Sequence, residues 1–284
     1  MKSIGFIDYF IDEWHANHFP DMVRKSKLGT DFKVTMAWEE MTPPGRRPLD
    51  AWCREQGVKA ARSQAEVVES CDCLVVLSPD NPECQERLAD LALRSGKPVY
   101  VDKPFTAHRA GAAACFEKAR RHCSPLLSCS ALRFTPAVAR ALATDFGARR
   151  PSYVATRGPG EFGVYSIHQI EMLVRAFGCG ARRVMQAGNR DATTMLVAYD
   201  DDRRGVVTLA PGSAFGITLG APGRDVLVLE SLDGFFEAFT DELLAFFTTG
   251  NSPIPSEETV EVVALVETGL RARETPDRWV DLVA

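Results

Sequence analysis

Two side chains in this sequence have the type and setting that proton transfer to an oxygen requires. Lys103 directly follows a short apolar run, and Pro104 restricts the chain on its other side. A lysine at the end of a buried strand can polarise or protonate a substrate oxygen. Histidine side chains ordinarily titrate near neutrality, so the residue type at His168 suits a general base. The competing interpretations are a loop lysine paired with Asp102 and a helix histidine satisfied by Glu171, one turn further on.

The elements that must position these residues alternate between strand and helix in the first half of the chain. The expected strands are 4–7, 32–38, 73–77, 98–101 and 126–128, and helices are expected at 15–25 and 109–122. Ser63 and Glu66 predict a capping box, and Asn81 before Pro82 predicts another helix start. This alternation is typical of a parallel sheet with right-handed crossovers. We therefore expect a Rossmann-like domain over residues 1–125.

The second half, residues 126–284, has a different pattern. The expected strands are 194–199, 206–209, 215–219 and 226–229, and the expected helices are 166–177, 235–248 and 257–271. Because few helices separate these strands, the pattern predicts a mostly antiparallel sheet. The whole chain is therefore expected to be an α/β protein with a C-terminal α+β domain.

Composition and charge exclude several classes of protein. The 284 residues are 45% hydrophobic and 25% charged, which is typical of soluble globular proteins. The net charge of −5 and the lack of Lys/Arg runs argue against a nucleic acid or membrane partner. The N-terminal apolar run is too short for a signal peptide, so we expect a cytoplasmic protein. The eight cysteines form no C-x-x-C pair, and we expect no metal and no disulfide.

Four segments, in order along the chain, resemble the glucose–fructose oxidoreductase/inositol dehydrogenase/MocA family. Residues 95–104 are similar to its "aGK-V-(E)KP" segment, 133–136 to its "RF-P" and 168–171 to its "H-x-x-D". Residues 242–253 carry the E, F, G and P of its C-terminal pattern. The resemblance spans nearly the whole chain.

The resemblance implies an NAD(P)-dependent oxidoreductase that transfers hydride to or from a hydroxyl or carbonyl carbon. Its substrate would be a sugar, a cyclitol or a related small polar metabolite, contacted by Arg133 and Glu171. The family's lysine corresponds to Lys103, near nicotinamide and substrate, and its histidine corresponds to His168. The open sheet of the second domain would hold a homo-oligomer together.

Cofactor-binding residues are expected where the parallel strands end, because ligands of such sheets bind beyond their carboxyl ends. Glu39 ends the second strand, where an acidic residue hydrogen-bonds an adenine ribose and repels a 2′-phosphate. NAD is therefore favoured over NADP, although Arg46 and Arg47 can reverse this preference. The other expected cofactor residues are Asp8, Tyr9, Phe10, Ser78, Pro79, Asn81, Asp102 and Lys103.

The sequence departs from the family at two places. The glycine positions of its G-x-G-x-x-G loop hold Ile7, Tyr9 and Asp12, and carboxylates stand where pyrophosphate would bind. Asp12 can instead cap the following helix. Four residues before the histidine the family's Asp is replaced by Val164, and the adjacent Tyr165 can supply an acidic hydroxyl as a catalytic group.

Two alternatives to a dehydrogenase therefore stay open. A family member with lost or altered cofactor use could run proton-transfer chemistry, such as elimination or isomerisation, with Lys103 and His168. A degenerate member could bind a ligand or support a partner subunit without catalysis. The loop without glycine separates the dehydrogenase from both alternatives, and the two retained residues separate both enzymes from the non-catalytic protein.

Overall fold

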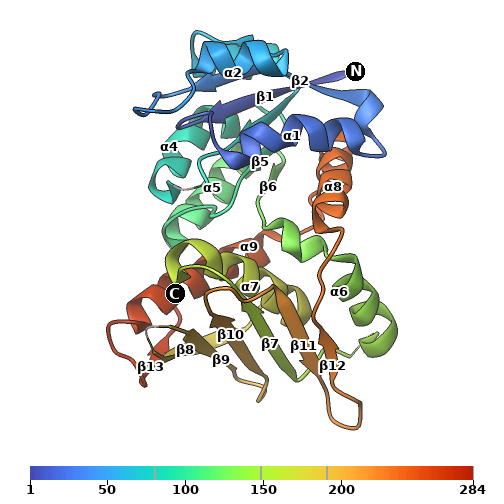
Figure 1. Ribbon diagram of the computed structural model, residues 1–284, viewed down its shortest axis with the longest axis vertical. Coiled ribbons are helices and arrows are strands. Elements are labelled where there is room, and N and C mark those ends of the chain that lie inside the picture. The colour runs from blue at the N-terminus through green and yellow to red at the C-terminus, as the bar shows by residue number, and fades with distance from the viewer. Residues whose placement is uncertain (80, 148, 190, 284) are drawn as a thin grey trace. The chain divides into compact units, whose positions relative to one another are not determined.

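The computed structural model describes residues 1–79, 81–147, 149–189 and 191–283 (Figure 1). These residues pack into two compact units: Met1–Cys129 with Phe239–Ser256, and Ser130–Ala238 with Glu257–Ala284. The division into domains 1–125 and 126–284 stays a prediction, because the units are defined by packing alone.

The first unit is built on a six-stranded parallel sheet in the order β3-β2-β1-β4-β5-β6. The strand order reverses between β1 and β4, which is where open α/β sheets bind their ligands. The expected Rossmann-like sheet is confirmed. Its strands are β1 (Lys2–Asp8), β2 (Phe32–Glu39), β3 (Lys59–Ala60), β4 (Cys73–Val76), β5 (Val99–Val101) and β6 (Leu126–Leu127).

Helices connect these parallel strands. They are α1 (Trp14–Lys25), α2 (Leu49–Gln56), α3 (Gln64–Ser70), α4 (Pro82–Leu93) and α5 (Arg109–Arg121), with a short 3-10 turn at Gly29–Asp31. Helix α3 approaches β1 so closely that a Cβ at Gly5 would lie 2.4 Å from Val67 Cγ1. Glycine fits there because the side chains of Val67 and Cys71 fill the space that a Cβ would need.

Helix α8 (Phe235–Thr249) brings a late segment of the chain back to the first unit, beside α1 (Figure 1). Phe239 packs its ring against Phe19 and Tyr100, with centroids 6.0 and 5.4 Å away. Asp241 accepts a hydrogen bond from Ser26 Oγ at 2.7 Å. Aromatic burial and this polar contact together explain why 239–256 packs with the first unit.

The second unit holds a seven-stranded sheet in the order β12-β11-β7-β10-β9-β8-β13. All neighbouring pairs are antiparallel except β7 and β10, so the expected mostly antiparallel sheet is confirmed. Helices α7 (Phe162–Phe177) and α9 (Ser256–Ala272) cover one face of it (Figure 1). The strands are β7 (Tyr153–Gly158), β8 (Ala181–Gly188), β9 (Thr193–Tyr199), β10 (Arg204–Leu209), β11 (Gly216–Gly220), β12 (Leu227–Leu229) and β13 (Trp279–Asp281).

A short helical stretch leads from β6 into this second sheet. It comprises the 3-10 turn Ala131–Phe134, α6 (Pro136–Ala141) and a π-helical turn at Leu142–Phe146. Among the described residues of either unit, no helix is both long and apolar enough to cross a membrane.

Candidate active site

Polar residues lie at the carboxyl edge of the first sheet, at the strand ends where the sequence predicted them. Asp8 ends β1, Ser78 follows β4, and Asp102 and Lys103 follow β5, with a cis peptide bond between Lys103 and Pro104. Ser78 is buried at a φ of 89°, a left-handed conformation that is uncommon for residues other than glycine. Asn81 begins α4 but makes no side-chain cap, because its amide donates to Glu83 at 3.0 Å.

A carboxylate of the chain occupies the N-terminus of α1. The cap is Glu13, whose oxygens accept from the backbone amides of His15, at 2.7 Å, and Ala16. The prediction that Asp12 caps this helix is therefore wrong by one residue. Burial raises the pKa of Glu13 to about 7, against the opposing charge of His15. The helix amides that can receive an anion are already bonded to one.

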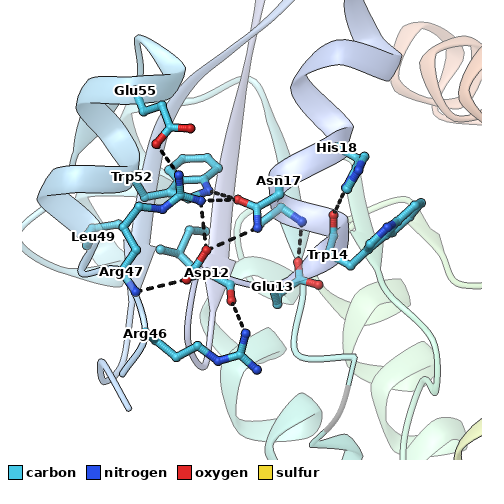
Figure 2. Close-up of polar contacts among 12 residues, drawn as sticks. Asp12, Glu13, Trp14, Asn17, His18, Arg46, Arg47, Leu49, Trp52 and Glu55 are labelled. Carbon is cyan, nitrogen blue, oxygen red and sulfur yellow. Dashed lines mark hydrogen bonds and ion pairs between the residues drawn. The ribbon is translucent and has the colours of Figure 1, made fainter. Parts of the chain in front are cut away.

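Asp12 instead anchors the loop that follows β2. Its carboxylate accepts from the Arg47 amide at 3.0 Å and from the Arg47 guanidinium at 2.9 Å, and Arg46 donates to its backbone carbonyl at 3.1 Å (Figure 2). Asn17 joins this network through Asp12 and Arg47, and the Trp52 indole donates to Asn17 at 2.8 Å. Both arginines are thus engaged by the β1–α1 loop.

Glu39, the residue expected to bind a ribose, is also engaged within the chain. Its carboxylate accepts from the backbone amides of Ile11 at 2.9 Å and Leu49 at 3.0 Å, and from the Thr42 hydroxyl. The loop residues Tyr9 and Phe10 lie beside it, with the Arg46 guanidinium 5.2 Å from the centre of the Phe10 ring. Glu39 therefore ties the β1–α1 loop to the segment that follows β2.

Asp8 is the least compensated polar group of this edge. It is fully buried, and neither carboxylate oxygen has a hydrogen-bond partner among the described residues. Burial, with Glu13 and Asp102 adding negative charge, raises its pKa well above the usual value despite the nearby Tyr9 and Phe10 amides. Natural structures contain few such buried unpaired groups, and they concentrate at functional sites.

In the second unit the predicted catalytic histidine is held by a serine. Ser130 Oγ and His168 Nδ1 lie 2.7 Å apart, and this contact fixes the imidazole ring on α7. Tyr165 is 41% exposed, and its ring lies 5.6 Å from that of His168, as does the ring of Phe215 on the other side. The histidine and the candidate hydroxyl therefore lie together on one helix.

The two residues expected to contact substrate form a buried ion pair. Arg133 donates to Glu171 at 3.0 Å and also pairs with Glu258, and the Arg133 and Glu171 side chains are each 2% exposed. Glu171 further accepts from the Ser130 amide at 3.2 Å. Burial raises the pKa of Glu171, which the Arg133 charge opposes. Through Ser130 this cluster supports the loop that contacts His168.

Comparison with known proteins gives the family of the first unit. Residues 10–127 match the family described as "Oxidoreductase family, NAD-binding Rossmann fold", whose members are the Gfo/Idh/MocA proteins. This segment is similar to that family. The resemblance drawn from the sequence motifs is therefore confirmed, and no curated protein matches the chain.

Solved structures show the same fold over the whole length. A scyllo-inositol dehydrogenase from Lactobacillus casei, with bound NAD(H) and scyllo-inositol, has a TM-score of 0.80 at 13% identity, over 99% of both chains. An Agrobacterium radiobacter oxidoreductase with NAD+, L-tartaric acid and magnesium reaches 0.78 at 13%, over 99% of this chain and 98% of that one. A Klebsiella pneumoniae NAD-binding oxidoreductase reaches 0.77 at 13%, over 100% and 99%.

The β1–α1 loop is not arranged like the glycine-rich loop that binds the pyrophosphate of a dinucleotide. The α1 amides donate to Glu13, the Ile11 amide donates to Glu39, and Asp8 adds a third carboxyl group. A dianionic pyrophosphate here would need to displace Glu13 and would meet like charges. Sequence reasoning missed the Glu13 cap, because glutamate is not among the residues that most often cap helices.

Replacing Glu13 with alanine tests whether this carboxylate excludes the phosphate group. We expect NADH to bind the variant about tenfold more tightly than wild type, because removing the cap frees two amides and one negative charge. The measurement is a fluorescence titration with NADH. Glu69→Ala, which removes an exposed carboxylate of the same unit, should leave binding unchanged. Equal affinity in Glu13→Ala and wild type would show that the cap does not compete.

Proposed function

We propose that the protein is an enzyme that acts at a hydroxyl- or carbonyl-bearing carbon of a sugar, cyclitol or related small polar compound. NAD(H) is its preferred redox partner over NADP(H). The observation that carries the proposal is the position of Lys103, directly after β5 at the carboxyl edge of the first sheet. This lysine lies within residues 10–127, which match an NAD-binding oxidoreductase family. The neighbour that binds scyllo-inositol supports the substrate class.

In this proposal the chain supplies charge and protons. Lys103 stabilises negative charge that develops on the substrate oxygen, and His168 exchanges the hydroxyl proton. Ser130 orients the His168 ring through Nδ1. Tyr165 remains a proposed acid. Arg133 and Glu171 remain proposed substrate-binding residues.

Proton transfer without a dinucleotide is the second candidate function, and the closed β1–α1 loop favours it. Elimination or isomerisation needs the same cation and base but no pyrophosphate site. A fluorescence titration of the purified protein with NADH and NADPH decides between the two. Saturable binding with preference for NADH supports the dehydrogenase. If neither nucleotide binds at about millimolar concentration, where the binding free energy is only about 4 kcal/mol, proton transfer takes its place.

Lys103→Met is expected to lower turnover by about 10²-fold or more, the usual scale for losing an electrostatic contact to a developing oxyanion. Methionine keeps the length of the side chain, so thermal unfolding should change little. Steady-state kinetics on a panel of sugars and cyclitols, beginning with scyllo-inositol, provide the measurement. Lys33→Met, an exposed substitution in β2, is the matched control. Full activity of Lys103→Met would remove the lysine from the mechanism.

The predicted homo-oligomer through the C-terminal sheet also remains a proposal. Tyr153, Val226, Val228 and Trp279 expose apolar side chains on or beside β7, β12 and β13. Apolar surface of this kind often marks an interface. The mass of the native protein in solution, measured by light scattering, tests it.

A further inference from the structure

A histidine–aspartate pair lies at the carboxyl edge of the first sheet. The roles proposed above for Lys103 and His168 do not involve it. His15, on the first turn of α1, places Nδ1 2.6 Å from Asp102 Oδ2. The other carboxylate oxygen, Oδ1, accepts from the Tyr100 hydroxyl at 2.9 Å. The two ends of the carboxylate are therefore fixed, and the imidazole is held by one of them.

The His15 side chain is mostly buried but keeps some surface. It is 13% exposed, and Nδ1 itself is buried, so the exposed surface belongs to other atoms of the side chain. The ring packs against Phe19 and Trp14, with centroids 5.9 and 5.2 Å away, which restricts its orientation. A partly exposed histidine with one nitrogen on a buried carboxylate has the arrangement of an acid–base group.

Charged groups from every neighbouring segment act on this pair. Burial lowers the pKa of His15, but the Asp102 charge and contact outweigh it and the net shift is upward, with Glu13 also raising it and Lys103 opposing. Burial raises the pKa of Asp102, and the charges of His15 and Lys103 outweigh that effect. The buried Asp8, whose carboxylate has no hydrogen-bond partner among the described residues, adds electrostatic repulsion against Glu13 and Asp102. Four carboxyl or imidazole groups and one ammonium thus meet at this edge of the sheet.

We propose that His15, held in place by Asp102, is a further acid–base residue of this protein. It works beside Lys103 on the substrate oxygen and is the alternative to His168 for exchanging the proton of that oxygen. The proposal rests on the substrate class of the proposed function, a hydroxyl or carbonyl compound. It does not depend on whether a nicotinamide takes part, since both candidate reactions move a proton at that oxygen. Asp102 is the positioning residue.

The proton balance is simple. Toward the alcohol, a hydride delivered to the carbonyl carbon, as NADH would supply it, moves the π electron pair of the carbon–oxygen bond onto the oxygen. The His15 imidazolium gives its proton to that oxygen and becomes neutral imidazole. In the reverse direction the neutral imidazole takes the hydroxyl proton and returns to the imidazolium. Lys103 keeps its protons and stabilises the negative charge on the oxygen, and Asp102 stays ionised and stabilises the imidazolium.

Chemical modification of the full-length protein tests the proposal without a substrate. Diethyl pyrocarbonate acylates accessible, unprotonated imidazole, and mass spectrometry locates the product. We expect His15 to react, with its half-maximal rate at a pH above the ordinary histidine value of about 6.5. In Asp102→Asn this midpoint should fall by about one pH unit, because the stabilising charge is lost. A wild-type His15 that stays unmodified while the exposed His18 reacts, or a midpoint that Asp102→Asn leaves in place, overturns the proposal.

Kinetics then separate this proposal from the proposed function. On whichever sugar or cyclitol wild type converts, His15→Gln should lower kcat/KM by about 10²-fold and move the near-neutral limb of its pH profile. His18→Gln, on the same helix, should leave both unchanged. If wild type converts no compound of the panel, the proposed function fails, whereas an unchanged profile in His15→Gln with an active wild type overturns only the role of His15. Should Asp102→Asn fail to fold, the wild-type modification profile and His15→Gln still decide.

Discussion

His168→Asn is expected to lower turnover by about 10²- to 10⁴-fold, the range for losing a general acid–base group. Asparagine keeps a polar side chain of similar reach on α7 but cannot titrate. Because Ser130 fixes Nδ1 of the histidine, the variant should also retain much of the local hydrogen bonding. Its substrate binding should therefore change less than its turnover, and kcat should carry most of the loss.

The pH profile shows whether His168 acts in proton transfer or only in packing. In wild type we expect a limb of kcat/KM near neutrality, and in His168→Asn that limb should be absent. Tyr165→Phe is the companion variant, since it removes the neighbouring hydroxyl and keeps the ring 5.6 Å from the histidine. An unchanged limb in His168→Asn would make the histidine structural and would leave Tyr165 and His15 as the remaining acid–base candidates.

Local patterns in the sequence predicted most elements of the fold. The helices expected at 109–122, 235–248 and 257–271 differ by one or two residues from α5, α8 and α9. The start predicted for α7, residue 166, is wrong by four residues, because the helix begins at Phe162. Glu161 at its N-terminus makes no side-chain cap, so the sequence carries no capping signal there. Four strands were not predicted: β3, β7, β8 and β13. Strands β3 and β13 have only two or three residues, which carry no recognisable periodicity. Strand β8 is long enough, but its buried residues do not alternate regularly.

Helix ends show where local rules reach their limit. Ser63 caps α3 as expected and accepts from the Glu66 amide, but Glu66 accepts from the Arg62 amide rather than completing the box. A glycine after the helical pattern, Gly96, predicts a left-handed end for α4, yet the helix ends at Leu93 and the glycine lies in the following turn at a φ of 73°. In both cases the residue type was recognised, while the partner was chosen by geometry that the sequence does not encode locally.

For the candidate site, too, the sequence predicted the positions of residues but not their contacts. Strand ends placed Asp8, Glu39 and Lys103 at one edge of the sheet, because the carboxyl ends of parallel strands share an edge. The contacts between Asp12 and Arg47, and between His15 and Asp102, join residues that are far apart in the sequence. No local pattern predicts such pairs. They nevertheless determine which charged groups are paired at this edge of the sheet.

Arg133→Met is expected to lower the free energy of unfolding by about 3–5 kcal/mol, the usual cost of removing one partner of a buried ion pair. Arg133 pairs with Glu171 and Glu258, and its loss would leave the Glu171 carboxylate, 2% exposed, without its cation. The double variant Arg133→Met with Glu171→Gln should recover part of the loss, because the fully buried side chain at position 171 then carries no charge, and only the more exposed Glu258 loses its partner. Arg140→Met, exposed on α6, should change stability by less than about 0.5 kcal/mol.

The deficit of Arg133→Met should also depend on pH in a definite direction. Burial raises the folded-state pKa of Glu171 above its unfolded value near 4.5, and removing Arg133 raises it further. Between these two pKa values the folded state binds more protons than the unfolded state, so folding becomes more favourable as the pH falls. Urea unfolding at about pH 8 and about pH 5 should therefore show a smaller deficit at the lower pH. A deficit below about 1 kcal/mol at both pH values, or one that grows on acidification, would mean that Glu171 carries no uncompensated charge in the variant and that Arg133 contributes mainly through packing.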